Sequence, residues 1–176
     1  FLQPVYSAVT GMPMSAETLV RWFHPTKGVI SPTKFIPLFE KNGFIMKLDQ
    51  YVWECACKQL KKWKEEGHKV MPISVNISRV NFFNPNLCDE LIDLVNKYEL
   101  PPTLLELEIT ESIAMKEKRH IIKILSGLRA MGIQIAIDDF GTEYSSLNYL
   151  KHLPVDRLKI DMSFVQGIEE DPKDAA

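Results

Sequence analysis

Side chains that suit metal-dependent chemistry recur at or near the ends of successive predicted strands. They are Glu17 and Arg21 in strand 16–22, Asn76 in strand 71–77, Glu108 and Glu111 at strand 104–109, Asp138 and Asp139 after strand 133–137, and Lys159 in strand 156–160. Each residue alone has an ordinary explanation, such as a surface ion pair or a turn. Because the carboxyl ends of parallel strands converge on one face of a barrel, their recurrence at equivalent places favours a shared site.

The chemistry of this set follows from its ligand atoms. Glutamate, aspartate and asparagine supply oxygen ligands, which Mg²⁺ and Mn²⁺ prefer, whereas zinc usually recruits histidine or cysteine. Several carboxylates that face one point repel each other unless a cation neutralises them. Two closely spaced cations are the usual arrangement for in-line phosphoryl chemistry. The sequence therefore predicts one or two divalent cations at this face.

Apolar runs alternate with helical patterns along the chain, which is typical of βα units and a parallel sheet. Ser31 followed by Pro32 predicts a helix start, and Gly43, Gly67 and Gly132 are placed to end helices. A further strand is predicted over 1–9, before a turn at Gly11. The predicted helices span 32–43, 48–66, 87–98, 118–131 and 146–151.

Composition excludes several classes of protein. The 176 residues include 21 basic and 23 acidic residues, a net charge of −2, with 45% apolar residues. The apolar content predicts a folded domain, and the absence of a basic excess argues against binding to a nucleic acid polymer. No run is long and apolar enough for a membrane segment, and the start shows no signal peptide. Three cysteines without zinc spacing fit reduced thiols in a cytoplasmic domain, free-standing or within a membrane-bound protein.

Several motifs together resemble the EAL domain, a bacterial family of phosphodiesterases that act on cyclic di-GMP. Their order and spacing match the family along the whole chain. The motifs are Gln3-Pro4, Glu17-Thr18-Leu19-Val20-Arg21-Trp22, Ser74-Val75-Asn76-Ile77-Ser78, Glu106-Leu107-Glu108-Ile109-Thr110-Glu111-Ser112, Asp138-Asp139-Phe140-Gly141-Thr142, and Leu153-Pro154-Val155-Asp156 with Leu158-Lys159-Ile160-Asp161.

The resemblance implies an α/β fold, a TIM-like (β/α)8 barrel with an antiparallel first strand, and a role for each matched residue. Lys159 would contact the attacking water or the second metal; a general base would have to be a neutral lysine, so we favour an orienting and charge-stabilising role. Glu111 would brace loop 138–146, which links the metal site to a dimer interface. The implied metal ligands are Glu17, Asn76, Glu108, Asp138 and, near the second metal, Asp139, and the implied substrate-binding residues are Gln3 and Arg21.

The implied reaction is hydrolysis of one phosphodiester bond of cyclic di-GMP to the linear dinucleotide pGpG, assisted by two Mg²⁺ or Mn²⁺ ions. The implied partners are cyclic di-GMP, a second copy of the chain in a homodimer, and fused GGDEF or sensory domains. The residues leave two alternatives open. One is a non-catalytic module that acts as a cyclic di-GMP receptor or a protein-interaction domain, and the other is an enolase-like barrel with a lysine base.

The sequence departs from the family pattern at three places. Thr18 replaces the alanine of the signature, which we expect to be mild because the side chain stays small. Glu143 replaces a glycine, and glutamate is disfavoured if that backbone requires a positive φ. The third departure is at the C-terminal end. A barrel of this type has eight strands and about 250 residues, whereas six strands are predicted here. We therefore expect residues 1–176 to be a partial EAL domain that lacks the last two βα units, and to be poorly stable and inactive alone.

Overall fold

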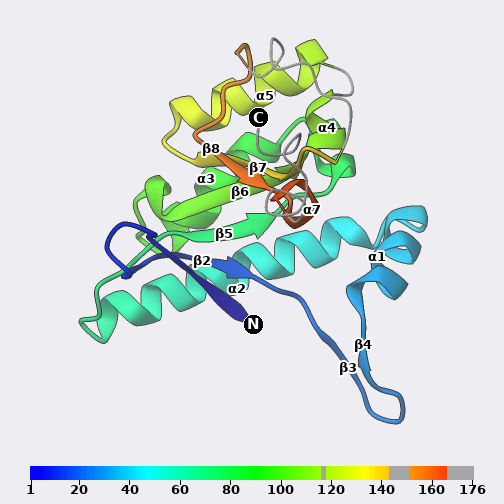
Figure 1. Ribbon diagram of the computed structural model, residues 1–176, viewed down its shortest axis with the longest axis horizontal. Helices are drawn as coiled ribbons and strands as arrows, with labels where there is room; N and C mark the ends of the chain where they lie inside the picture. Colours follow the sequence, from blue (N-terminus) through cyan, green and yellow to red (C-terminus); the bar gives the residue numbers. More distant parts are fainter. Residues whose placement is uncertain (116–117, 143–150, 166–176) are drawn as a thin grey trace.

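The computed structural model describes residues 1–115, 118–142 and 151–165. One sheet contains the strands β1 (Leu2–Tyr6), β2 (Pro13–Thr18), β5 (Ile73–Asn76), β6 (Leu105–Thr110), β7 (Gln134–Phe140) and β8 (Arg157–Ile160), in the order β1-β2-β5-β6-β7-β8. β1 is antiparallel to β2, and every other neighbouring pair is parallel. The sheet curls as part of a barrel, which confirms the predicted α/β barrel class with its reversed first strand (Figure 1).

Helices lie along the outer side of the sheet (Figure 1). Residues 146–150 of the predicted helix 146–151, and Glu143, lie outside the described residues. The α-helices are α1 (Pro32–Lys41), α2 (Ile45–Glu65), α3 (Leu87–Lys97), α4 (Glu111–Met115), α5 (Lys118–Ala130) and α7 (Met162–Val165), and two 3-10 helices span Arg79–Phe83 and Pro102–Leu104.

The predicted helix boundaries have local causes in the structure. Pro32 occupies the first turn of α1, where the missing N–H costs no hydrogen bond. Gly67 follows α2 with φ of 73°. His68 N donates to Trp63 O at 3.0 Å and Gly67 N to Lys64 O at 3.2 Å, which is the hydrogen-bond pattern of a Schellman cap.

The predicted strand 16–22 is wrong at its end. β2 stops at Thr18, whose hydroxyl donates to Ser74 O at 2.9 Å. The chain then leaves the sheet and forms a separate hairpin from β3 (Trp22–His24) and β4 (Gly28–Ile30). Trp22 is drawn away from the sheet because its indole packs edge-on against Phe35 of α1, with ring centroids 5.7 Å apart.

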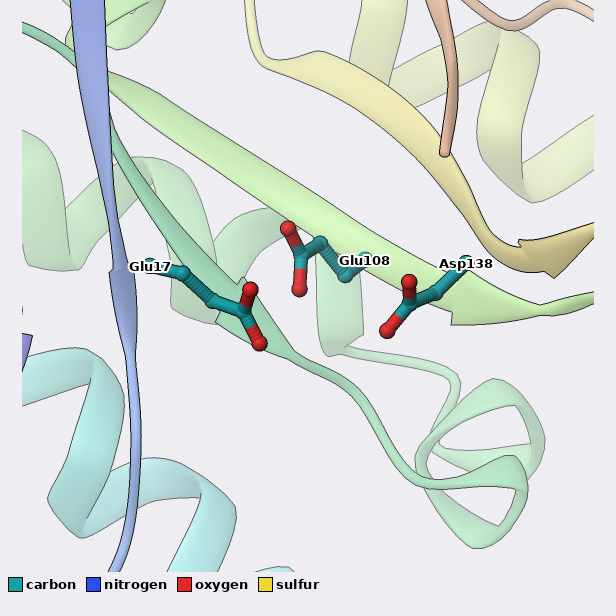
Figure 2. A group of neighbouring side chains, drawn as sticks. All are labelled: Glu17, Glu108 and Asp138. Atoms are coloured by element: carbon teal, nitrogen blue, oxygen red, sulfur yellow. The ribbon is translucent and has the colours of Figure 1, made fainter. Parts of the chain in front are cut away.

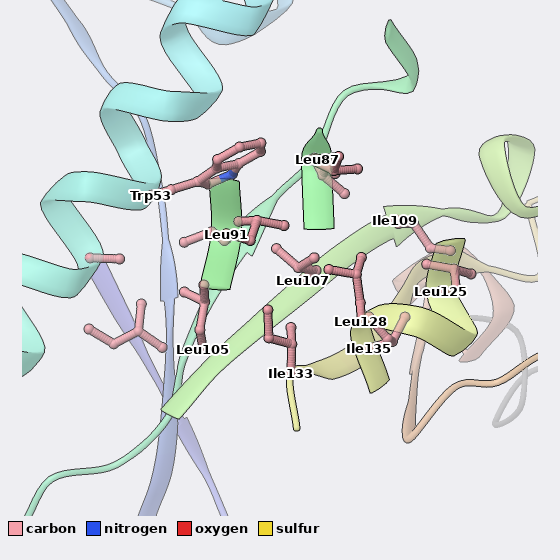
Figure 3. Packing of buried hydrophobic residues seen from close by; sticks show 14 of the residues in the cluster. Trp53, Leu87, Leu91, Leu105, Leu107, Ile109, Leu125, Leu128, Ile133 and Ile135 are labelled. Atoms are coloured by element: carbon pink, nitrogen blue, oxygen red, sulfur yellow. The ribbon is translucent and has the colours of Figure 1, made fainter. Parts of the chain in front are cut away.

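The hydrophobic core lies between the outer face of the sheet and helices α2, α3 and α5 (Figure 3). Alternate strand residues supply it, for example Leu105, Leu107 and Ile109 of β6, all fully buried. The indole of Trp53 closes the core from α2, and its Nε1 donates to Asn76 O at 3.1 Å, which ties the helix to the end of β5. Among the described residues, no helix has both the length and the apolar character that a membrane crossing requires.

Candidate functional site

The inner face of the sheet is polar, in contrast to the apolar outer face. Because strand residues alternate between faces, the neighbours of each core residue point inward. The inner-face residues are Ser15 and Glu17 on β2, Ser74 and Asn76 on β5, Glu106 and Glu108 on β6, Ala136 and Asp138 on β7, and Arg157 and Lys159 on β8. Predicted site residues from five strands therefore share one surface, namely Glu17, Asn76, Glu108, Asp138 and Lys159.

Three carboxylates converge at the carboxyl end of this surface. Glu17, Glu108 and Asp138 each offer an oxygen atom, and these atoms lie within 4.8 Å of one another. Figure 2 shows the three side chains pointing toward a common point from three strands. The side chain of Glu108 is 1% exposed, while those of Glu17 and Asp138 are 19% and 21% exposed. Burial raises the pKa of Glu108, and Lys159 opposes that shift.

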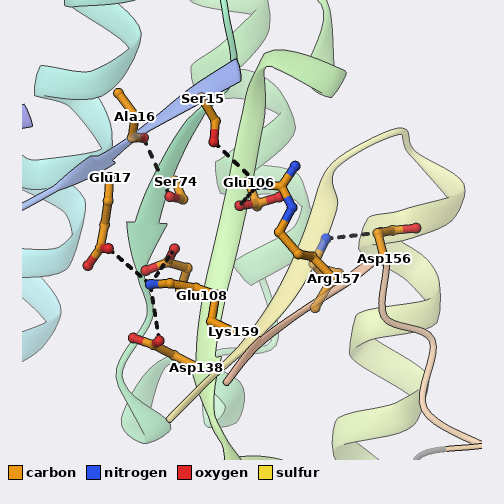
Figure 4. A network of polar contacts seen from close by, with 11 residues as sticks. Ser15, Ala16, Glu17, Ser74, Glu106, Glu108, Asp138, Asp156, Arg157 and Lys159 are labelled. Atoms are coloured by element: carbon orange, nitrogen blue, oxygen red, sulfur yellow. Dashed lines mark hydrogen bonds and ion pairs between the residues drawn. The ribbon is translucent and has the colours of Figure 1, made fainter. Parts of the chain in front are cut away.

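Lys159 lies at the point where the carboxylates meet (Figure 4). Its Nζ is 3.0 Å from Glu17 Oε2, 3.0 Å from Glu108 Oε1 and 3.0 Å from Asp138 Oδ1. Burial by itself would lower the pKa of Lys159, but the ion pairs to Glu108, Glu17 and Asp138 outweigh burial and raise it. An ammonium group held in this way orients and stabilises negative charge and has no free lone pair with which to accept a proton.

The carboxylate cluster suits a divalent cation of the hard type. Its ligand atoms are all oxygen, which fits Mg²⁺ or Mn²⁺. The second carboxylate oxygen of Glu108 is buried and has no hydrogen-bond partner among the described residues. A buried carboxylate oxygen in that state is stabilised by coordination to a cation.

A β-bulge shapes the end of β7. The ladder between β7 and β8 pairs Ile137 with Leu158 and then Phe140 with Ile160, so β7 contains one extra residue. Asp138 points into the cluster, while Asp139 has φ of 53° and is exposed. Asp139 is not among the three clustered carboxylates, and its role at a second metal stays a prediction.

The backbone at Asp139 leads to a stability prediction. Replacing Asp139 with Val should lower the free energy of unfolding by about 1–2 kcal/mol, because β-branched residues are disfavoured at positive φ. Asp139→Asn is the matched control and should change it by less than about 0.5 kcal/mol, because asparagine tolerates this conformation. Urea unfolding of both variants is the measurement. Equal losses in the two variants would show that backbone conformation does not select this residue.

Three other predicted site residues, Asn76, Gln3 and Arg21, lie around the cluster. Asn76 pairs with Glu108 in the β5–β6 ladder, and Gln3 pairs with Glu17 in the β1–β2 ladder. Arg21 lies beyond the end of β2 and is exposed, and its Nη1 donates to Val20 O at 2.8 Å. The structure thus brings together Glu17, Glu108, Asp138 and Lys159 directly, with Asn76 and Gln3 beside them in register.

Glu111 contacts the loop that follows β7. It is 2% exposed at the start of α4. Its Oε2 accepts a hydrogen bond from Gly141 N at 3.0 Å. Glu111 thus contacts the described part of loop 138–146, and its bracing role stays a prediction, since residues 143–146 lie outside the described residues.

Two features of the site were not predicted from the sequence. One is an ion pair between Glu106 and Arg157 beneath the carboxylate cluster, at 3.1 Å. The strand alternation could have indicated this pair. Glu106 stands two positions before Glu108, and Arg157 stands two positions before Lys159, so each lies on the same face as a predicted site residue. The other is Asp49 of α2, which lines a pocket of about 480 Å³ together with Arg21 and Asn76. Nothing in the sequence distinguishes Asp49 from the solvated carboxylates of the same helix.

Asp49 is a buried carboxyl group held by hydrogen bonds from Ser78 and Asn81. It is 7% exposed. Its Oδ2 accepts from Ser78 N at 2.8 Å and from Asn81 Nδ2 at 2.6 Å. Burial raises the pKa of Asp49 to about 6 against these hydrogen bonds.

This raised pKa predicts a pH-dependent stability. Below its ordinary value of 3.8 the carboxyl is neutral in both the folded and unfolded states. Between pH 3.8 and about 6 the unfolded state releases the proton while the folded state keeps it. The free energy of unfolding of wild type should therefore fall across this range by up to about 3 kcal/mol relative to that of Asp49→Asn. Asparagine can keep both hydrogen bonds through its carbonyl oxygen. Urea unfolding across this pH range should show that gap, with exposed Asp93→Asn as control, and a constant difference would contradict the raised pKa.

Comparison with known proteins places these features in a family. The model of the EAL domain family matches residues 1–176. The bifunctional diguanylate cyclase/cyclic di-GMP phosphodiesterase MucR of Pseudomonas aeruginosa is 43% identical over 174 residues, which is 99% of this chain and 25% of MucR. The cyclic di-GMP phosphodiesterase NbdA of the same organism is 40% identical over 172 residues, 98% of this chain and 22% of NbdA. The chain thus spans about a quarter of the length of these curated relatives.

Two solved structures also align closely with this chain. The MucR phosphodiesterase in complex with cyclic di-GMP aligns with a TM-score of 0.91 at 42% identity, over 99% of this chain and 70% of that one. The EAL domain of FimX from Pseudomonas aeruginosa bound to cyclic di-GMP aligns with a TM-score of 0.86 at 29% identity, over 98% of this chain and 69% of that one.

Proposed function

Because the chain belongs to the EAL domain family, we propose that it hydrolyses one phosphodiester bond of cyclic di-GMP to give linear pGpG, with Mg²⁺ or Mn²⁺ bound at its carboxylate cluster. The observation that supports this proposal most is the meeting of Glu17, Glu108 and Asp138 around Lys159 at the carboxyl ends of four strands. This face carries the active site in barrel enzymes.

The cluster residues would hold the metal ions and the reacting groups in place. Glu17, Glu108 and Asp138 are the proposed first ligands, with Asn76 beside Glu108 and Asp139 nearer a second ion. Two bound ions would activate a water molecule and neutralise charge that develops on the phosphoryl oxygens. The surrounding carboxylates raise the pKa of Lys159 and keep its ammonium group protonated. Lys159 would therefore orient the water and stabilise the same charge rather than act as a base.

The residues around the cluster would bind the substrate and maintain the loop. Arg21 presents a guanidinium group, which matches phosphate oxygens with paired N–H donors. Gln3 pairs with Glu17 in the ladder and would face the ligand from the first strand. Glu111 would fix the loop after β7 through Gly141 N.

Because residues 1–176 alone are expected to be inactive, the test uses the protein extended at its C-terminus by the last two βα units expected of the barrel. The purified protein is incubated with cyclic di-GMP and Mn²⁺ or Mg²⁺, with product analysis by chromatography. We expect pGpG in the presence of metal and none in the presence of a chelator. Failure to hydrolyse by protein that binds both Mn²⁺ and cyclic di-GMP would contradict the proposed reaction. Binding without turnover would instead favour a cyclic di-GMP receptor.

Family membership also supports a proposed assembly and setting. We propose a cytoplasmic homodimer, and fusion to GGDEF or sensory domains. The fusion is in keeping with the relative MucR, a bifunctional diguanylate cyclase/cyclic di-GMP phosphodiesterase. Sedimentation of the protein with and without cyclic di-GMP tests the dimer, and a single monomeric species at all concentrations would contradict it.

A further inference from the structure

A second polar layer lies directly beneath the carboxylate cluster on the inner face. Its members each stand two residues before a cluster residue on the same strand: Ser15 before Glu17 on β2, Glu106 before Glu108 on β6, and Arg157 before Lys159 on β8. Arg157 Nη1 donates to Glu106 Oε1 at 3.1 Å and to Ser15 Oγ at 3.4 Å (Figure 4). One guanidinium group therefore contacts two other strands of the half-barrel.

The ion pair between Glu106 and Arg157 crosses over β7. In the two ladders, Ala136 of β7 pairs with Glu108 on one side and with Arg157 on the other. Ala136 is fully buried and its methyl side chain is small. A larger side chain at this position would occupy the path that the Arg157 side chain takes from β8 to β6.

Backbone hydrogen bonds tie both ends of β8 to β7, from Asp156 N to Ile135 O at 2.8 Å and from Asp161 N to Phe140 O at 3.1 Å, but the strand is held less regularly between them. The regular ladder to β7 is interrupted between Ile137 and Phe140, and Lys159 lies opposite that interruption. The outward side chains Leu158 and Ile160 are 42% and 59% exposed, so within the described residues helix packing holds β8 weakly. Arg157 is the inner-face residue that precedes the irregular stretch, and it reaches β6 directly.

Stability alone does not account for this pair. Glu106 is 1% exposed, and the side chain of Arg157 is 31% exposed. The free-energy cost of removing a carboxylate from water can equal or exceed the stabilisation from its ion pair. Apolar residues of similar volume often replace such pairs without loss of stability. A partly buried pair that contributes little to stability but joins two strands has a geometric role.

We propose that Glu106 and Arg157 are positioning residues that fix β8 against β6 across Ala136 and thereby hold the ammonium group of Lys159 at Glu17, Glu108 and Asp138. This inference deepens the proposed function, because Lys159 is the residue assigned there to orient water. The position of the Lys159 ammonium group can also be tested in the metal-free protein, without measuring turnover.

The direct test is the ¹H–¹⁵N signal of the Lys159 ammonium group in metal-free protein with chelator present. In wild type the three ion pairs should slow proton exchange enough for this signal to be seen, and its loss in Lys159→Arg assigns it. In Glu106→Met/Arg157→Met, which leaves no buried charge unpaired, the signal should disappear through exchange with water while the fold is kept. Persistence of the signal in this folded double variant would overturn the inference.

Matched variants separate positioning from general loss of structure. Arg129→Gln removes a 2.8 Å ion pair to Asp156 on the exposed side of the same region and should leave the Lys159 signal unchanged. If the double variant does not fold, Arg157→Lys and Arg157→Gln decide. The lysine variant keeps a cation facing Glu106 and should retain the signal, and the glutamine variant should lose it; the same result in both would count against the inference.

The catalytic readout is a split between kcat and KM for cyclic di-GMP. The double variant should lose at least about tenfold in kcat with little change in KM, because small displacements of a catalytic group mainly affect the chemical step. Absence of hydrolysis in wild type would refute the proposed function, whereas the ammonium signal would still decide whether the pair positions Lys159.

Discussion

Replacing Glu108 with Gln is expected to lower cyclic di-GMP hydrolysis about 1,000-fold, which corresponds to about 4 kcal/mol of transition-state stabilisation. The substitution keeps the shape of the side chain but removes one anionic oxygen ligand. Glu108 is the most buried member of the cluster, with a side chain that is 1% exposed, so water can replace it least well. The dissociation constant for Mn²⁺, followed by electron paramagnetic resonance, should rise at least about tenfold.

A matched control for this variant is Glu65→Gln on the exposed side of α2, which lies outside the carboxylate cluster. It should leave both Mn²⁺ affinity and hydrolysis unchanged. If Glu108→Gln binds Mn²⁺ as wild type does, the three-carboxylate cluster is not the metal site.

Replacing Lys159 with Met should have opposite effects on metal binding and on catalysis. In chelator, the three carboxylates lose their shared cation, and the free energy of unfolding should fall by about 3 kcal/mol, as for a broken buried ion pair. Mn²⁺ should recover most of this loss, because the metal takes over the neutralising role. Mn²⁺ should also bind more tightly than to wild type, since no ammonium group competes for the oxygens.

Hydrolysis by the same variant should nevertheless fall at least about 100-fold, because the proposed water-orienting cation is gone. Thermal unfolding with and without Mn²⁺ and initial rates at saturating Mn²⁺ are the measurements. Lys62→Met is the control, since Lys62 forms an exposed pair with Glu66 at 3.8 Å that should contribute under about 1 kcal/mol. Weaker Mn²⁺ binding in Lys159→Met would show that Lys159 supports the metal site instead of competing with it.

Much of the site was accessible from the sequence because its residues follow simple periodicities. Glu108, Asp138 and Lys159 stand at the ends of strands whose apolar alternation is clear, and parallel strands bring such ends together. The helix ends at Gly67 and Gly132 were predictable for the same kind of reason, since both glycines have positive φ.

The missed features depend on long-range packing or on single backbone positions. The hairpin of β3 and β4 has three-residue strands, which are too short for a periodic pattern to appear. The bulge in β7 depends on one extra residue at Asp139, which two adjacent aspartates do not reveal. Asp49 can be buried because Ser78 and Asn81 supply hydrogen-bond donors from a distant segment. The sequence of α2 alone does not indicate these donors.

The strict alternation of the two faces of β6 has a consequence for how this chain can change over evolution. Leu105, Leu107 and Ile109 are buried in the core, while Glu106 and Glu108 form the polar inner layers. Substitutions can therefore alter one face and leave the other intact. A one-residue deletion within β6 would exchange the faces, burying charge in the core and removing the carboxylate from the cluster. Point substitutions are thus a far safer route to new specificity than insertions or deletions in the strands, and β7, with its extra residue at Asp139, is the strand whose pairing departs from this regular alternation.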